Sequence, residues 1–257
     1  MYSNQLLDLN NPEVRQRLLA DRLQGGQTLV TSQLCKELGV SLATLRRDLL
    51  SLEAQGLVKR VRGGAVPLSA PALPYKERQP QKPDFIHNAT AALAPYLHDD
   101  MVLLLDGGHS LLQLARALPV LKNLLIITPA PAVALVAMER NIKTLLIGGQ
   151  LSPLGAVSVG ALAERQLASC AADLCIQGTC AIDVNFGFSA DDLEEASLRQ
   201  QMAHSSTKTI VIADKSKLNR RARHQVHPLS ETHLLITDAA QIETEIFSNA
   251  GLLITNV

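Results

Sequence analysis

Two basic segments of the chain, residues 41–54 and 57–62, carry side chains suited to binding nucleic acid. In the first, Thr44, Arg46 and Arg47 fall opposite a row of leucines. The planar guanidinium of arginine can hold a phosphate or the O6/N7 edge of guanine, and a threonine in the first helical turn can donate to a phosphate or touch a base edge. Cations in the second segment can lie along the phosphate backbone, which adds affinity with little sequence information. The candidate DNA-contacting residues are Thr31, Ser41, Thr44, Arg46, Arg47, Lys59, Arg60 and Arg62.

A second group of polar and glycine residues follows several short apolar runs of the C-terminal part. A glycine-rich turn that opens a helix exposes backbone N–H groups to an anion, and a facing lysine would complete a phosphate site. Glycines that only form turns and lysines that are only solvated are the alternative, which the pattern leaves open. The candidate residues are Asp106, Gly107, Gly108, His109, Ser110, Thr128, Gly148, Gly149, Gly178, Lys215 and Lys217.

Three helices and a hairpin would position the first group. The apolar spacing predicts helices over residues 12–24 and 31–38, the second ending at Gly39, and a third helix after Ser41, whose hydroxyl can cap it. The side chains on the core-facing side of the third helix would be Leu42, Leu45, Leu49 and Leu52. Asp48 interrupts the positive run and is expected to orient one of its arginines, because phosphates would repel a carboxylate.

The hairpin follows at Gly56, which should end the third helix. Residues 57–62, followed by Gly63-Gly64, indicate the strands and tip of a wing. Residues 1–66 are therefore predicted to form a winged helix-turn-helix domain. Residues 1–65 carry nine Lys and Arg against six Asp and Glu, so charge alone would also suit a solvated surface. The spacing is what favours DNA binding.

The rest of the chain predicts a linker and an α/β domain. Residues 67–83 hold five of the twelve prolines, which is typical of a semi-extended linker. In residues 84–257, apolar runs alternate with helical patterns, which predicts a mostly parallel sheet covered on both faces. In such folds ligands bind beyond the carboxyl ends of the strands. The predicted strands are residues 101–105, 124–127, 143–147, 174–177, 209–213, 234–236 and 252–254.

Bulk properties exclude several classes of protein. The 257 residues carry a formal net charge of zero and 47% hydrophobic residues without a membrane-length apolar run, which predicts a globular protein with no membrane partner. The N-terminus lacks a secretory signal pattern, so the expected location is the cytoplasm. Cys170, Cys175 and Cys180 are five residues apart, which fits neither a zinc site nor a redox pair. They are expected to be small buried hydrophobes, with no metal and no cofactor.

A longer pattern runs through the N-terminal segment. It comprises Arg15, Leu19, Leu23, Ser41, Thr44, Leu45, Arg46, Arg47, Asp48, Leu49, Leu52, Glu53, Gly56, Arg60, Arg62, Gly63, Gly64 and Ala65. At every one of these positions the segment resembles the DNA-binding domain of the DeoR-type bacterial transcription regulators. The resemblance implies a winged helix-turn-helix that binds double-stranded DNA.

Residues 75–257 are similar to the sensor domain of the same regulators, which has a fold like that of ribose-5-phosphate isomerase and binds sugar phosphates. The matching residues are Asp106, Gly108, Thr128, Gly148, Gly149, Gly160, Gly178, Ile182, Asp183, Gly187, Glu195, Asp214, Ser216, Lys217, Ile236, Thr237 and Asp238. The resemblance adds Asp183 to the candidate effector site. The chain departs from the family pattern at His109, Leu111, Pro129 and Cys180, which puts phosphate binding in doubt.

Three functions are compatible with these observations. The first is a regulator, expected to repress a carbohydrate-utilisation operon, in which a homo-oligomer (dimer or tetramer) binds an operator and responds to a phosphorylated sugar. The second is a sugar-phosphate isomerase-like enzyme with Asp183, Glu195, Lys215 or Lys217 as acid–base groups; no constellation beyond these residues supports it, so the prediction is no enzyme. The third is an architectural DNA-binding protein that has lost its effector.

Overall fold

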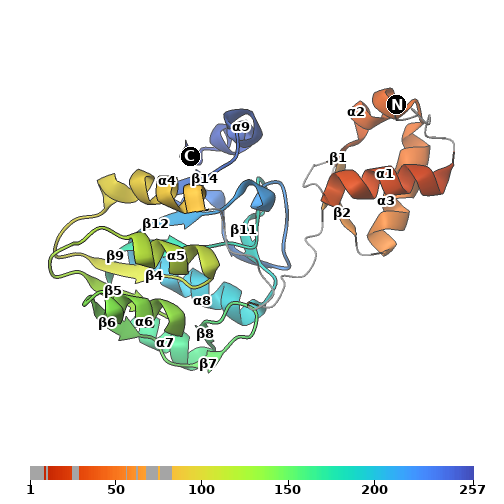
Figure 1. Cartoon of the computed structure of the whole chain (residues 1–257). Coiled ribbons are helices and arrows are strands. Elements are labelled where there is room, and N and C mark those ends of the chain that lie inside the picture. Colours follow the sequence, from red (N-terminus) through yellow and green to blue (C-terminus); the bar gives the residue numbers. More distant parts are fainter. Residues whose placement is uncertain are drawn as a thin grey trace, which may run out of the picture. The chain divides into compact units, whose positions relative to one another are not determined.

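The computed structural model describes residues 9, 11–24, 29–55, 57–61, 63–67, 75 and 83–257. The chain divides into two compact units, with the main boundary between Ala70 and Pro71 (Figure 1). Within the described residues, no helix combines the length and apolar character needed to cross a bilayer.

The N-terminal unit contains the three predicted helices, α1 (Pro12–Gln24), α2 (Thr31–Leu38) and α3 (Leu42–Ala54). Strands β2 (Val58–Val61) and β3 (Gly64–Pro67) form the predicted wing hairpin, and β3 runs one residue into the predicted linker. A short strand that was not predicted, β1 (Leu29–Val30), pairs with the other side of β3. Where β3 pairs with β1, position 64 admits only glycine, because a Cβ on Gly64 would lie 1.9 Å from the carbonyl oxygen of Leu29.

The core of this unit is leucine-rich and confirms most of the predicted apolar stripe of α3. Its buried members are Leu19, Leu29, Leu34, Leu38, Leu45, Leu49, Leu52, Val58 and Ala65. The prediction for Leu42 was wrong, because its side chain is 43% exposed. As the first residue of α3 it leans back towards the helix start, beyond the turn that packs on the core. Gly56, Arg62 and the side chain of Leu23 lie outside the described residues.

The C-terminal unit is built on a seven-stranded sheet of order β15-β14-β12-β9-β4-β5-β6 in which every pair is parallel. All seven predicted strands are present, although the last lies two residues further along the chain than predicted. Their bounds are β4 (Val102–Leu105), β5 (Leu125–Thr128), β6 (Lys143–Leu146), β9 (Ala172–Gln177), β12 (Ser206–Ile212), β14 (Leu234–Thr237) and β15 (Ile254–Asn256). Leu103, Leu104 and Leu105 on β4 are all inaccessible, so both faces of this central strand are buried.

Helices cover the two faces of the sheet. Figure 1 shows α4 (Pro83–Leu93), α5 (His109–Ala117) and α6 (Pro131–Glu139) along one face, and α7 (Ala161–Ala168) and α8 (Leu193–His204) along the other. Helix α9 (Gln241–Asn249) packs against β15 at one edge. The predicted α/β architecture with a covered parallel sheet is therefore confirmed.

Two small antiparallel sheets were not predicted. Strands β10 (Ala181–Asp183), β11 (Gly187–Ala190) and β13 (His224–His227) form one, in segments that follow the carboxyl ends of β9 and β12. Strands β7 (Gln150–Leu151) and β8 (Ser158–Val159) form the other, after β6. Both sheets bring extra loops to the edge of the main sheet where its strands end.

Candidate DNA interface and effector site

The start of α3 is fixed by Ser41. Its Oγ accepts a hydrogen bond from the backbone N–H of Thr44 at 3.1 Å, and the two hydroxyls lie 2.8 Å apart. An oxygen that satisfies one of the first N–H groups is the usual reason for a helix to begin where it does. Arg46 and Arg47 are exposed on the following turn. The cap therefore fixes the start of the helix and, with it, the positions from which these two arginine side chains project.

A hollow of about 530 Å³ lies beside this helix start. Its lining combines the first turn of α1 with the α2–α3 turn and the first turns of α3, and consists of Pro12, Arg15, Gln16, Gly39, Val40, Ser41, Thr44, Arg47 and Asp48. Two helix N-termini, each a carrier of partial positive charge, thus border the same hollow as the Arg47 side chain. This combination suits a DNA phosphate.

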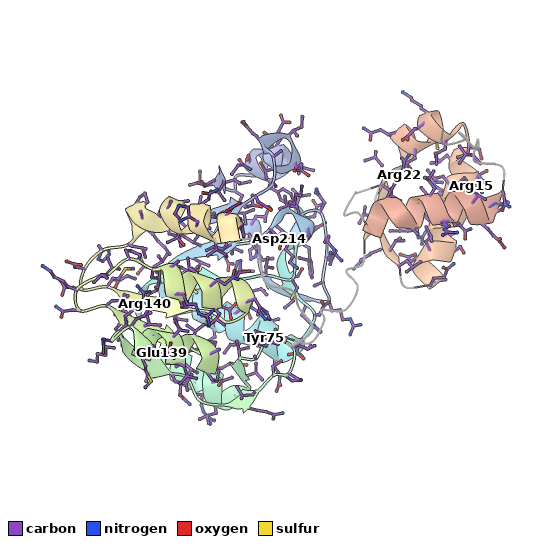
Figure 2. The ribbon with its side chains drawn as sticks, in the orientation of Figure 1. Arg15, Arg22, Tyr75, Glu139, Arg140 and Asp214 are labelled. Carbon is purple, nitrogen blue, oxygen red and sulfur yellow. The ribbon has the colours of Figure 1, made fainter. Side chains whose placement is uncertain are left out.

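Asp48 has a different partner from the one expected. Its carboxylate is buried and accepts hydrogen bonds from Nε and, at 3.1 Å, from Nη2 of Arg15 on α1, rather than from Arg46 or Arg47. Arg15 also donates to the carbonyl of Leu9 at 2.7 Å. The α-helical spacing explains the correction, because Asp48 falls on the leucine face of α3, three residues after Leu45. The pair ties α1 to α3 (Figure 2 labels Arg15 on α1).

Two candidate DNA contacts are engaged within the unit itself. The side chain of Arg60 donates through Nε to Glu53 at 2.6 Å, and its backbone N–H donates to the same carboxylate at 2.9 Å. These two bonds lower the pKa of Glu53. The hydroxyl of Thr31 donates to the carbonyl of Gly63 at 2.7 Å. Arg60 therefore joins the wing to α3, Thr31 joins the wing tip to α2, and Lys59 is exposed.

In the C-terminal unit, the parallel register brings the loops after β4, β5, β6, β9 and β12 to one edge of the sheet. Gly108 precedes α5 with φ of 97° and has no side chain to cap the first N–H groups of that helix. Gly107 must also be glycine, because a Cβ there would lie 2.4 Å from Val157. Gly108, His109 and Ser110 are all half-buried, so this helix start is accessible from the edge.

The carboxylate of Asp106 points inwards. It is inaccessible to solvent and accepts hydrogen bonds from Arg199 Nε at 2.8 Å and from the backbone N–H groups of Gly107 at 2.7 Å and Gly178 at 3.2 Å. Arg199 also donates to Glu195 at 3.2 Å, and Glu195 accepts from the Ser152 hydroxyl at 2.6 Å. Burial alone would lower the pKa of Arg199, but the two carboxylates raise it above its ordinary value. Asp106 thus holds the loops after β4 and β9 together.

Arg199 and Ser152 were not among the predicted site residues. The spacing of Glu195 and Arg199, four residues apart on a helix, is the available signal for their ion pair. It does not indicate that the pair is buried, nor that it reaches Asp106. Ser152 carries no sequence signal, because it belongs to a loop whose position depends on the β7–β8 hairpin.

The other candidate effector residues differ in accessibility. Thr128 is inaccessible, and its hydroxyl accepts from the N–H of Ala130 at 3.1 Å. Asp183 is 6% exposed and accepts from two backbone N–H groups of the next turn, at 2.9 and 2.8 Å. The backbone N–H of Gly148 donates to the side-chain Oε1 of Gln166, and the backbone carbonyl of Gly148 accepts from the Nε2 of the same side chain. The members with accessible surface are Gly108, His109, Ser110, Gly148, Gly149, Gly178, Lys215 and Lys217.

The cysteines show no arrangement that would hold a metal. Cys175 is fully buried, which raises the pKa of its thiol, and Cys170 and Cys180 are half-buried. Across the part of the chain that the structure describes, no group of three or more His, Cys, Asp or Glu side chains could hold a metal ion.

A second hollow, of about 580 Å³, lies at the amino-terminal ends of the strands, near the start of β6. Arg140 in its wall donates to the carbonyls of Ala115 and Leu118 and so completes the C-terminal end of α5 (Figure 2 labels Arg140). Because ligands of parallel sheets bind at the carboxyl ends of strands, we do not assign the effector to this hollow.

Comparisons with known proteins agree with the architecture of both units. Residues 15–70 match the DeoR-like helix-turn-helix domain, and residues 88–239 match the DeoR C-terminal sensor domain. The HTH-type transcriptional regulator GlpR of Haloferax volcanii is 31% identical over 88% of this chain and 90% of its own length. The putative aga operon transcriptional repressor of Escherichia coli O157:H7 is 26% identical over 87% of this chain and 85% of its own.

Among solved structures, ribose 5-phosphate isomerase from Plasmodium falciparum is similar, with 19% identity, a TM-score of 0.37 and coverage of 52% of each chain. The family match is the stronger finding, because both domain models fit in the order and at the positions of the two units. The chain belongs to the DeoR family of transcription regulators.

Proposed function

We propose that this DNA-binding regulator represses a carbohydrate-utilisation operon and that a phosphorylated sugar controls it. The observation that carries the proposal is the uncapped start of α5 behind Gly108, at the edge of the sheet where ligands of such folds bind. The name of the similar putative aga operon transcriptional repressor supports a repressing role. Because the family is one of regulators, the chain is a regulator rather than an enzyme.

The DNA-binding half of the proposal uses the exposed face of α3. Arg46 and Arg47 would enter the major groove, with Thr44 at the helix start and Lys59 on the neighbouring backbone. The buried Arg15–Asp48 pair would keep α3 at a fixed angle to α1, which base recognition requires because bidentate contacts tolerate little misplacement. Thr31, Arg60 and Ser41 would act mainly by holding the wing and the helix start in place.

The effector half uses the accessible part of the candidate site. The phosphate would accept from the first N–H groups of α5, and Lys217 and Lys215 after β12 would supply positive charge. Buried Asp106, Thr128 and Asp183 would shape the loops without touching the ligand. Asp183 and Glu195 both accept hydrogen bonds within the protein, so neither is placed as a general base for an isomerase.

We further propose that the regulator works as a homo-oligomer in the cytoplasm. One small winged domain buries too little surface for tight specific binding, so paired domains are needed. The edge strand β6 exposes Leu145 and Leu146, each 45% accessible, and the α6 helix packed on it exposes Leu135 and Met138, 60% and 63% accessible. A cluster of exposed apolar side chains at an open sheet edge supports an interface with a second copy.

The proposal is tested by fluorescence anisotropy of the full-length protein with DNA from upstream of its own operon, at several salt concentrations and with a panel of sugars and their phosphates. We expect salt-sensitive specific binding that one sugar phosphate weakens and its unphosphorylated sugar does not. DNA binding that no sugar phosphate changes would support the architectural alternative. Transcription from that promoter, measured with and without the protein, separates repression from activation.

A further inference from the structure

Tyr75 is fixed at two points although it belongs to the predicted linker. Its backbone N–H donates to the carbonyl of Pro153 at 3.2 Å. Its ring stacks on the imidazole of His109, with 4.2 Å between the ring centroids and 15° between the planes. Both rings are half-buried in the C-terminal unit (Figure 2 labels Tyr75). Along the chain, Tyr75 stands between the last strand of the DNA-binding unit and α4.

Both contact points belong to the walls of the proposed effector site. His109 is the first residue of α5. Pro153 lies in the loop whose Ser152 donates to Glu195 and whose Val157 packs over Gly107. Hydrogen bonds through Glu195, Arg199 and Asp106 connect this loop to the segment that leads into α5. Whatever moves the start of α5 therefore acts on both attachments of Tyr75.

We propose that the effector site holds the linker through Tyr75 and that a phosphorylated ligand displaces this residue. The inference rests on the proposed function of the site. Side chains at a helix start lean towards the N-terminus, so His109 and the ring stacked on it lie on the side of the first N–H groups of α5. A phosphate bound to those N–H groups takes up space on the same side. The ligand and the stacked ring therefore compete, and release of Tyr75 carries the signal into the linker.

Competition fixes the sign of the mutational effects. Removing the ring should tighten ligand binding about 2- to 10-fold, which is the value of an aromatic stacking contact. It should also remove the effect of the ligand on DNA affinity, which for coupled sites is commonly about 5- to 150-fold. If the ring instead contacted the ligand, its removal would weaken binding.

The first test needs no identified effector. Chymotrypsin cleaves after tyrosine, so the rate of cleavage between Tyr75 and Lys76 in the full-length protein, followed by mass spectrometry, reports how firmly Tyr75 is held. His109→Ala should speed this cleavage several-fold, whereas His87→Ala, at an exposed position on α4, should not. Sodium phosphate should speed it in the wild type relative to sodium chloride of equal ionic strength. An unchanged rate in His109→Ala, or with phosphate, overturns the proposal.

The second test uses the sugar phosphate found in the DNA-binding assay. Tyr75→Ala should bind it more tightly and lose the ligand effect on DNA binding, while Tyr75→Phe, which keeps the stacking ring, should behave as wild type. Weaker ligand binding by Tyr75→Ala, or a ligand effect of wild-type size, overturns the proposal. If no sugar phosphate binds the wild type, the proposed function fails, and the cleavage experiment still decides whether the start of α5 holds Tyr75.

Discussion

Removing Asp48 should destabilise the DNA-binding unit although Asp48 is not expected to touch DNA. Its carboxylate is 2% exposed and holds Arg15, which is 4% exposed. Asp48→Ala would leave a buried guanidinium without its counter-charge, which costs about 3–5 kcal/mol. A unit of this size unfolds at a cost of roughly 3–10 kcal/mol, so the loss is a large part of the total.

The replacement of both partners is the informative comparison. Arg15→Met combined with Asp48→Leu keeps the volume but leaves no buried charge, and such exchanges are often neutral or stabilising. We therefore expect the double variant to regain stability and DNA affinity. Glu37→Ala is the matched control, because it breaks the exposed Arg22–Glu37 pair between α1 and α2 and should change little.

Differential scanning calorimetry of the full-length chain measures the stability, and anisotropy measures DNA binding. For Asp48→Ala the transition of the N-terminal unit should fall by at least ~12 °C, since 1 kcal/mol corresponds to about 4–8 °C in a domain of this size. Wild-type stability of Asp48→Ala would refute the structural role. A double variant that is stable but no longer binds DNA would instead show that the charges themselves contact the operator.

Three further outcomes are expected. Arg46→Ala should cost about 1–3 kcal/mol in DNA affinity and relax base preference, whereas Lys59→Ala should weaken binding to all sequences and lower the salt slope by about one; equal effects on base preference would contradict these roles. His227 is buried, which lowers its pKa from 6.5 to about 4. The unfolded chain takes up this proton at a higher pH than the folded chain does. The contribution of neutral His227 to the free energy of unfolding should therefore be complete above pH 6.5 and fall by up to ~3 kcal/mol as the pH decreases to 4, and His227→Gln should lose less stability over this range. An identical pH dependence of both proteins in urea titrations would exclude His227 as the cause. Asp106→Ala should lower the melting temperature of the C-terminal unit by leaving the buried Arg199 with Glu195 as its one remaining described counter-charge, and a normal melting temperature with lost ligand binding would make Asp106 a ligand contact instead.

The elements that sequence predicted best are those with a strong local signal. Most strands of the main sheet are short apolar runs, and a run buried on both faces, such as β4, needs no information from its neighbours. Helix α3 combines a serine cap with regular leucine spacing. By contrast, β1 consists of only two residues and exists because β3 passes beside it, with Gly64 allowing the approach. Strands β10, β11 and β13 likewise depend on one another rather than on their own composition.

Long-range partners were the least predictable part of the site. The sequence suggested that Asp48 pairs with an arginine, but its partner lies 33 residues away on another helix. Asp106 is engaged by Arg199, 93 residues away. In both units a carboxylate in a family motif proves to be buried and paired. Such residues fit the pattern because the fold needs them, so the pattern alone does not separate structural positions from contacting ones.

That separation changes how the departures from the family pattern are interpreted. Leu111 is 2% exposed and packs against Gly178, and Pro129 is buried, so neither substitution removes a donor from the accessible part of the candidate effector site. His109 and Cys180, in contrast, are half-buried at the edge of the sheet. The departures that can alter ligand choice therefore reduce to an imidazole at the start of α5 and a thiol after β9. Since the imidazole also carries Tyr75, a change at His109 would alter ligand preference and linker attachment together.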